Sequence, residues 1–339
     1  MQISVGRAKS HVMDILRARL VPMIHGSPAV GKSSIIHQVA KEFNLKLIDV
    51  RLSTAEPTDL TGFPDINEKT GKATYIPMDT FPLEGDEVPE GYNGWLIFFD
   101  EISSASRAIQ AAAYKILLDR MVGQRNLHKQ VAMACAGNLE TDGAIVEPMS
   151  TALQSRLVHL EVTPNVQEWR EYAASEGWDH RITAYINWKP GSLYNFTADH
   201  TDKTYASPRT WEFADRFTRG VENLDEGMLV KLAGTLGEGE AREFITFTKI
   251  YRDLPTMGQI LEAGKIMKVP EEPSILFALV GAMSHNATEE NCGALMDFVK
   301  RMPIEFQVVA LREMVRRNRA LDKHPAIIEW ISGNAQELF

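Results

Sequence analysis

Disulfide chemistry and metal-binding cysteine motifs are missing from this chain. Its 339 residues include only two cysteines, Cys135 and Cys292, which lie far apart in the sequence. Cysteines so placed exclude a disulfide framework and a zinc ribbon, and they fit a reducing compartment. The nine histidines form no cluster with ligand spacing. The sequence therefore predicts neither a zinc site nor a redox site.

Long hydrophobic runs and an excess of positive charge are also absent. No apolar stretch approaches the roughly 20 residues that a membrane-spanning helix needs, and the first residues lack the apolar core of a signal peptide. We therefore expect a cytoplasmic protein that does not enter a membrane. The 36 lysines and arginines against 45 aspartates and glutamates give a net charge of −9. This balance argues against generic nucleic-acid binding and leaves only a local basic patch open.

The pattern of apolar residues divides the chain into an α/β part and a helical part. Over residues 10–163, strand-like runs alternate with helical patterns, which predicts a parallel sheet with helices on both faces. Five strands are expected, at residues 20–24, 45–51, 95–100, 131–136 and 158–162. From residue 164 on, only helices are expected, at residues 166–175, 181–187, 208–219, 227–234, 240–251, 274–284, 289–301, 304–320 and 325–332.

These changes of pattern set the expected domain boundaries. We expect an α/β domain over residues 1–163, a helical domain over 164–269 and a helical C-terminal extension over 270–339. Within the first, residues 56–93 are too many for a plain loop and predict an elaborated insertion. A hairpin turn is expected at residues 68–72, and a second hairpin directly before residue 131.

A phosphate-binding loop follows the first expected strand. Residues 26–33 read Gly-Ser-Pro-Ala-Val-Gly-Lys-Ser and precede a helical pattern. Backbone N–H groups at a helix N-terminus and glycines without side chains suit a chain of phosphates. Lys32 would bind the β- and γ-phosphates of ATP, and Ser33 would place a hydroxyl on Mg²⁺. The predicted ATP-binding residues are Gly26, Ser27, Pro28, Ala29, Val30, Gly31, Lys32, Ser33 and Ser34.

Two carboxylates end the most apolar of the expected strands. Asp100 and Glu101 follow a run of aromatic and aliphatic residues, and the carboxyl ends of parallel strands are where open α/β sheets bind their ligands. Asp100 would hold Mg²⁺ through water, beside the Ser33 hydroxyl, and Glu101 would orient and deprotonate the attacking water. The alternative is an acidic helix start capped by Ser103 and Ser104.

Three further polar residues are candidates for the same chemistry. Asn138 ends the strand at 131–136, where an amide could bind both the γ-phosphate and the water; otherwise Gly-Asn is only a turn. Arg156 precedes the last expected strand, and Arg209 starts a helix of the second part. Guanidinium groups stabilise phosphoryl transfer, but spacing alone does not distinguish these arginines from surface residues.

Taken together, these motifs resemble the AAA+ ATPases, and specifically their MoxR-like branch. The resemblance covers residues 10–215 and implies a P-loop NTPase core followed by an all-helical lid. By this similarity Asn138 is sensor 1, Arg156 is an arginine finger that reaches a neighbouring protomer, and Arg209 is sensor 2 of the lid. The family implies a homo-oligomer in the form of a hexameric ring, which remodels proteins, often beside a partner with a von Willebrand factor A domain.

The sequence departs from that branch after the paired carboxylates. Ser103 and Ser104 stand where many relatives have Asn-Arg, and Arg107 is the nearest substitute for the missing arginine.

The leading hypothesis is an ATP-hydrolysing motor that remodels a protein partner. The main alternative is a nucleic-acid translocase or loader, for which two basic stretches, around residues 120–129 and 312–323, could serve. No aromatic platform accompanies these stretches, so solvated faces explain them more simply. A third possibility, a nucleotide-gated scaffold without turnover, would not need Glu101, Asn138 and Arg156.

Overall fold

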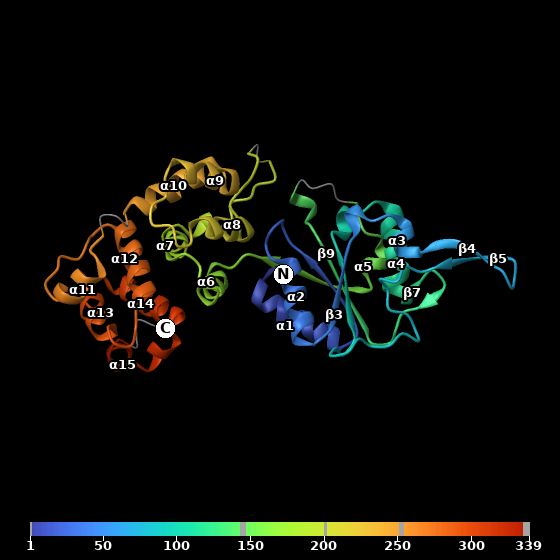
Figure 1. The fold of residues 1–339 in the computed structure, drawn as a ribbon, viewed down its shortest axis with the longest axis horizontal. Coiled ribbons are helices and arrows are strands. Elements are labelled where there is room, and N and C mark those ends of the chain that lie inside the picture. The colour runs from blue at the N-terminus through green and yellow to red at the C-terminus, as the bar shows by residue number, and fades with distance from the viewer. Residues whose placement is uncertain (1, 143–146, 200–201, 251–253, 335–339) are drawn as a thin grey trace. The chain divides into compact units, whose positions relative to one another are not determined.

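The computed structural model describes residues 2–142, 147–199, 202–250 and 254–334. The chain separates into two compact units. The first consists of Met1–Asn165 with Thr197–Asp199, and the second of Val166–Phe196 with His200–Phe339. Each unit has hydrophobic clusters of its own, so each is described separately (Figure 1).

A parallel sheet of six strands forms the first unit, in the order β1-β10-β2-β9-β6-β3. The strands are β1 Gln2–Ser4, β2 Val21–His25, β3 Lys46–Arg51, β6 Trp95–Asp100, β9 Val131–Gly137 and β10 Leu157–Thr163. All five expected strands are present, but the expected number was wrong, because β1 adds a sixth by pairing with Glu161, Val162 and Thr163. Three residues are too few to show a strand pattern in a sequence, so only the pairing with β10 defines β1.

Helices cover both faces of this sheet. In β6, Trp95, Ile97 and Phe99 belong to one hydrophobic cluster with Ile109 and Ala113 of α4. Leu96 and Phe98 alternate to the other face, and both are fully buried, where α2 contacts β6. The helices of this unit are α1 Val5–Arg17, α2 Lys32–Glu42, α3 Pro57–Thr61, α4 Arg107–Asp119 and α5 Thr151–Gln154. The long apolar run of β6 is thus explained by burial on two sides.

Two antiparallel hairpins interrupt the α/β pattern. The first joins β4 Phe63–Asn67 to β5 Lys72–Ile76, which confirms the turn expected at residues 68–72. Gly71 has φ +65° in this turn, a conformation that suits glycine. The second joins β7 Met121–Val122 to β8 Arg125–Asn126 directly before β9, as expected. Figure 1 shows both hairpins on the first unit.

The described part of the second unit is helical. Its helices are α6 Val166–Ser175, α7 His180–Trp188, α8 Pro208–Thr218, α9 Glu226–Leu236, α10 Glu238–Lys249, α11 Met257–Ala263, α12 Pro273–Asn286, α13 Cys292–Val299, α14 Ile304–Arg317 and α15 Pro325–Gly333. The helices expected after residue 164 are present, although the expected end at residue 251 lies outside the described residues. The short α11 was not expected. Among the described residues, no helix combines the length and apolar character needed to cross a bilayer.

Two hydrophobic clusters stabilise the second unit. One surrounds Tyr185, Trp211 and Phe244, and the other contains Met283 and Phe298. α12 contributes to both clusters, through Ala278 and Leu279 respectively. The three-part division of the chain, with its boundary at residue 270, stays a prediction.

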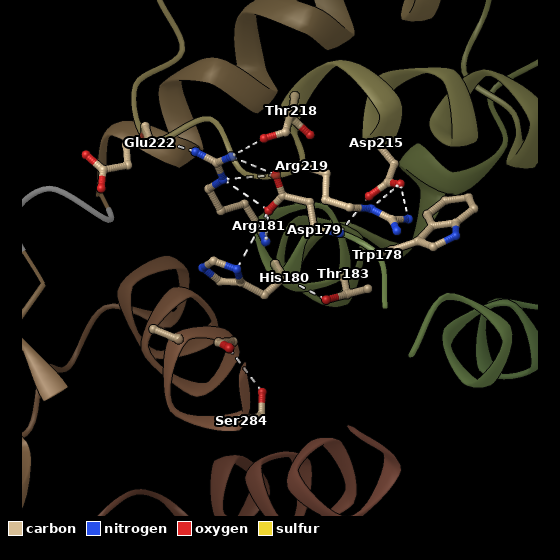
Figure 2. Close-up of polar contacts among 12 residues, drawn as sticks. Trp178, Asp179, His180, Arg181, Thr183, Asp215, Thr218, Arg219, Glu222 and Ser284 are labelled. Atoms are coloured by element: carbon tan, nitrogen blue, oxygen red, sulfur yellow. Dashed lines mark hydrogen bonds and ion pairs between the residues drawn. The ribbon is translucent and has the colours of Figure 1, made fainter. Parts of the chain in front are cut away.

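A buried polar network fixes the start of α7 (Figure 2). Arg181 donates to the Asp179 carboxylate through Nε, at 3.0 Å from Oδ1, and through Nη2, at 2.7 Å from Oδ2. It also donates to the backbone oxygens of Thr218 and Glu222. Burial would raise the pKa of Asp179, but the hydrogen bonds and charge of Arg181 outweigh it and hold this pKa below its usual range.

Candidate functional site

The loop after β2 has the backbone geometry of a phosphate cradle. Gly31 has φ +104° and Ala29 has φ +63°, so the loop makes a left-handed turn just before α2 begins at Lys32. A Cβ on Gly26 would lie 2.8 Å from Val162 Cγ2 and 2.9 Å from Val162 O, so only glycine fits there. Helix α2 begins directly after this loop, and the unpaired backbone N–H groups of its first turn are suited to anion binding.

Lys32 lies across this loop and reaches the neighbouring strand. Its Nζ donates to the backbone oxygens of Gly26 and Ser27 and, at 2.9 Å, to Oδ1 of Asn138. The residue is only 9% exposed. Asn138 follows β9, which pairs directly with β2. The structure thus brings Lys32 and Asn138 together, although 106 residues separate them.

Ser33 and Asp100 form the second contact at this edge of the sheet. Ser33 Oγ donates to Asp100 Oδ2 at 3.0 Å, and Asp100 is buried at the end of β6. Two oxygens of this kind fit Mg²⁺, which takes one or two protein ligands and completes its shell with phosphate and water. No group of three or more histidine, cysteine or acidic side chains able to hold a metal occurs among the described residues.

Glu101 has an unusual backbone conformation. Its φ is +57°, which is rare for a residue with a side chain and is often found at functional sites. Its backbone N–H donates to Asp100 Oδ1 at 2.9 Å, and its carboxylate accepts a hydrogen bond from Ser53 Oγ. Ser53 lies in the short helix Leu52–Thr54 directly after β3, the neighbour of β6. No sequence pattern marks Ser53, since only the pairing of β3 with β6 places it beside Glu101.

Burial shifts the pKa of two side chains near this edge of the sheet. Burial, followed by the negative charge of Asp100, raises the pKa of Asp49 on β3. Burial also lowers the pKa of His25, the residue before Gly26, to about 4. His25 is therefore neutral near pH 7.

His25 takes part in a hydrogen-bonded chain that no sequence pattern marks either. His159 Nε2 lies 2.9 Å from the backbone oxygen of Gln154, and His159 Nδ1 lies 2.8 Å from His25 Nε2. Because a carbonyl oxygen only accepts, His159 carries a proton on Nε2, and in its neutral form His159 Nδ1 accepts the hydrogen bond from His25 Nε2. Both histidines line a cavity of about 820 Å³ together with Ser103 and Asn138.

The two candidate arginines lie outside this group of contacts. Arg156 follows α5, is exposed, and donates from Nη1 to the backbone oxygen of Ala152 at 2.9 Å. Arg209 is exposed near the start of α8, in the second unit. Their roles as arginine finger and sensor 2 stay predictions.

Residues 22–161 match the family model described as "ATPase family associated with various cellular activities (AAA)". The matched range begins in β2, ends in β10, and contains the phosphate loop, Asp100, Glu101, Asn138 and Arg156. The first unit contains an AAA ATPase domain. An ATP-binding function of the P-loop follows from this assignment.

Comparison with solved structures gives distant matches. One is a candidate ATPase from Cytophaga hutchinsonii, with 12% identity and a TM-score of 0.37, over 99% of this chain and 90% of that one. Another is NtrX from Brucella abortus, with 13% identity and a TM-score of 0.38, over 93% of this chain and 68% of that one. No curated protein matches the sequence.

Proposed function

We propose that this chain is a ring-forming AAA+ motor of the MoxR-like type, which hydrolyses Mg-ATP and uses the energy to remodel or activate a protein partner. The observation that carries the proposal is the convergence of two contacts at one sheet edge, Lys32 with Asn138 and Ser33 with Asp100. A P-loop lysine, a magnesium-binding pair and a polar sensor are the parts that hydrolysis of a bound triphosphate needs.

Each of the predicted site residues in the AAA domain would have a separate role. Lys32 and the N-terminus of α2 bind the phosphates, while Ser33 and Asp100 hold Mg²⁺. A bound Mg²⁺ would supply positive charge against the phosphate oxygens. Glu101 accepts a proton from the attacking water, and Asn138 orients that water against the γ-phosphate.

The ring follows from Arg156 and from the family resemblance. An exposed arginine at the end of α5 is suitable for reaching a neighbouring protomer, and ATP at such an interface would favour assembly. A partner with a von Willebrand factor A domain is expected on the same resemblance. The nucleic-acid alternative gains no support from the stretch at 312–323, because Arg316 binds Glu313 and Arg317 binds Thr183 within the second unit.

Two single variants of lysines on α2 test the nucleotide site. Lys32→Ala should weaken binding of a fluorescent ATP analogue by roughly 100-fold or more, because it removes the charged donor from the phosphates. Lys41→Ala, which removes an exposed lysine from the same helix, should bind like the unaltered protein. Equal affinity of the two variants would refute the assignment of the P-loop.

Mixing of inactive subunits tests the ring. Arg156→Ala and Lys32→Ala proteins should each fail to hydrolyse ATP. In a mixed ring, however, some interfaces pair the intact P-loop of an Arg156→Ala subunit with the intact arginine finger of a Lys32→Ala subunit. Phosphate release should therefore reappear on mixing, well above the activity of either variant, since a finger contributes roughly 10³-fold or more. If rings that are shown to be mixed release no phosphate, the hypothesis is wrong. That hypothesis is that Arg156 acts on the neighbouring protomer and that each interface can hydrolyse ATP independently.

A further inference from the structure

Ser103 joins three segments of the AAA domain. It lies in the short helix Ile102–Ser104, which directly follows Glu101. Its Oγ accepts a hydrogen bond from the backbone N–H of Asn138 at 2.9 Å, and its backbone oxygen accepts one from Glu147 N at 2.8 Å. Ser103 is only 4% exposed, and its bond to Asn138 is partly buried.

The end of β9 also leaves no room for a side chain beside Ser103. A Cβ added to Gly137 would lie 2.6 Å from Ser103 Oγ and 3.0 Å from Met23 Cε. Gly137 therefore leaves the space that the Ser103 hydroxyl fills. The contact sets how closely the turn after β6 and the end of β9 approach each other.

This hydrogen bond fixes the backbone from which the Asn138 side chain projects. The N–H of Asn138 points to Ser103, and its Oδ1 accepts from Lys32 Nζ at 2.9 Å. Asn138 is thus held at two points, one on the segment that carries Glu101 and one on the P-loop. Loss of the Ser103 hydroxyl would leave a partly buried N–H without its protein acceptor and would release one of the two restraints.

We propose that Ser103 is a positioning residue for ATP hydrolysis, which acts through Asn138. Its hydroxyl holds the Asn138 backbone in place. The Asn138 side-chain amide can then contact the γ-phosphate and the same attacking water from which Glu101 takes a proton. The proposal rests on the proposed role of Asn138 in hydrolysis. It also gives a function to the first serine of the pair that stands where many MoxR-like relatives have Asn-Arg.

The proposal predicts an effect on turnover rather than on nucleotide binding. Ser103→Ala should lower kcat by roughly 10-fold, the effect of losing one hydrogen bond that orients a polar group in the site. KM for ATP should change less than about threefold, because Lys32 and the P-loop backbone remain in place. Ser104→Ala, the same change at the next residue, should hydrolyse ATP at the unaltered rate.

A double-mutant cycle with Asn138→Ala tests whether Ser103 acts through Asn138. Asn138→Ala should reduce kcat more than Ser103→Ala does, and adding Ser103→Ala to it should change kcat by less than twofold. If Ser103→Ala lowers kcat equally in both backgrounds, or leaves it unchanged while Asn138→Ala lowers it, the proposal for Ser103 is wrong. Full turnover by Asn138→Ala would instead overturn the proposed role of Asn138, and with it this proposal.

A pair of isosteric variants separates the hydroxyl from effects on folding. Ser103→Thr and Ser103→Val have similar volumes and differ in a hydroxyl that replaces a methyl group, so most of the strain from the added volume is common to both. Circular dichroism and ATP-analogue binding would establish that both are folded. The Thr variant should turn over ATP roughly 10-fold faster than the Val variant. Equal rates would show that the hydroxyl has no positioning role.

Discussion

Removal of Arg181 should destabilise the helical second unit strongly. The Asp179 side chain is only 3% exposed and accepts hydrogen bonds from Nε and Nη2 of Arg181. The Arg181→Met variant leaves this carboxylate buried without its counter-charge and removes the donor to the Thr218 carbonyl. Loss of one partner of a buried ion pair costs about 3–5 kcal/mol, so we expect a loss of that size in the free energy of unfolding of this unit.

An exposed ion pair in the same unit provides the matched control. Arg242 pairs with Glu238 on α10, where the side chains are 61% and 70% exposed. The Arg242→Met variant makes the same chemical change and should lower stability by less than about 0.5 kcal/mol, since exposed helical pairs contribute little. The comparison removes the general effect of replacing an arginine by methionine.

Denaturant unfolding followed by tryptophan fluorescence would measure both variants. Five of the six tryptophans belong to the second unit, so their signal reports mainly on this part of the chain. A third variant, Asp179→Asn with Arg181→Met, removes the buried charge and should recover part of the lost stability. If Arg181→Met is no less stable than Arg242→Met, the ion pair does not support this fold.

Three further predictions concern the active site and the pH dependence of stability. Glu101→Gln should retain ATP binding and lose roughly 100-fold in phosphate release, because the general base is gone; near-normal turnover would show that another group acts as the base. Ser53→Ala removes a hydroxyl donor that competes with the attacking water for the Glu101 carboxylate. This variant should raise the basal rate of ATP turnover by roughly three- to tenfold. A decrease would indicate that Ser53 holds Glu101 in the position needed for hydrolysis. Burial lowers the pKa of His180 to about 4 despite the neighbouring Asp179 carboxylate, so the unfolded chain, with a histidine pKa near 6.5, takes up the proton first. The second unit should therefore lose stability as the pH falls from about 6.5 toward 4, and His180→Asn should flatten this dependence in thermal unfolding; an unchanged slope would contradict the assignment.

The P-loop and the strands around it were predictable because their signals are local. Residues 26–33 contain the glycines, Lys32 and Ser33 in one continuous segment, and the structure gives that segment the backbone turn that phosphate binding needs. Burial on both faces makes β6 apolar over its whole length, so its sequence alone marks it as a central strand. The hairpin turn at residues 68–72 was predictable for the same reason, since turn residues define it.

Only the tertiary structure decided which polar groups meet at the sheet edge. Ser53 reaches Glu101 across 48 residues, Asn138 reaches Ser103 across 35, and His25 reaches His159 across 134. Single serines and histidines carry no pattern that marks such partners, because their pairing depends on which strands lie side by side. β1 shows the same limit, since three residues become a strand only by hydrogen bonding to β10. Local sequence specifies how a segment folds, whereas its long-range partners are set by the packing of the whole sheet.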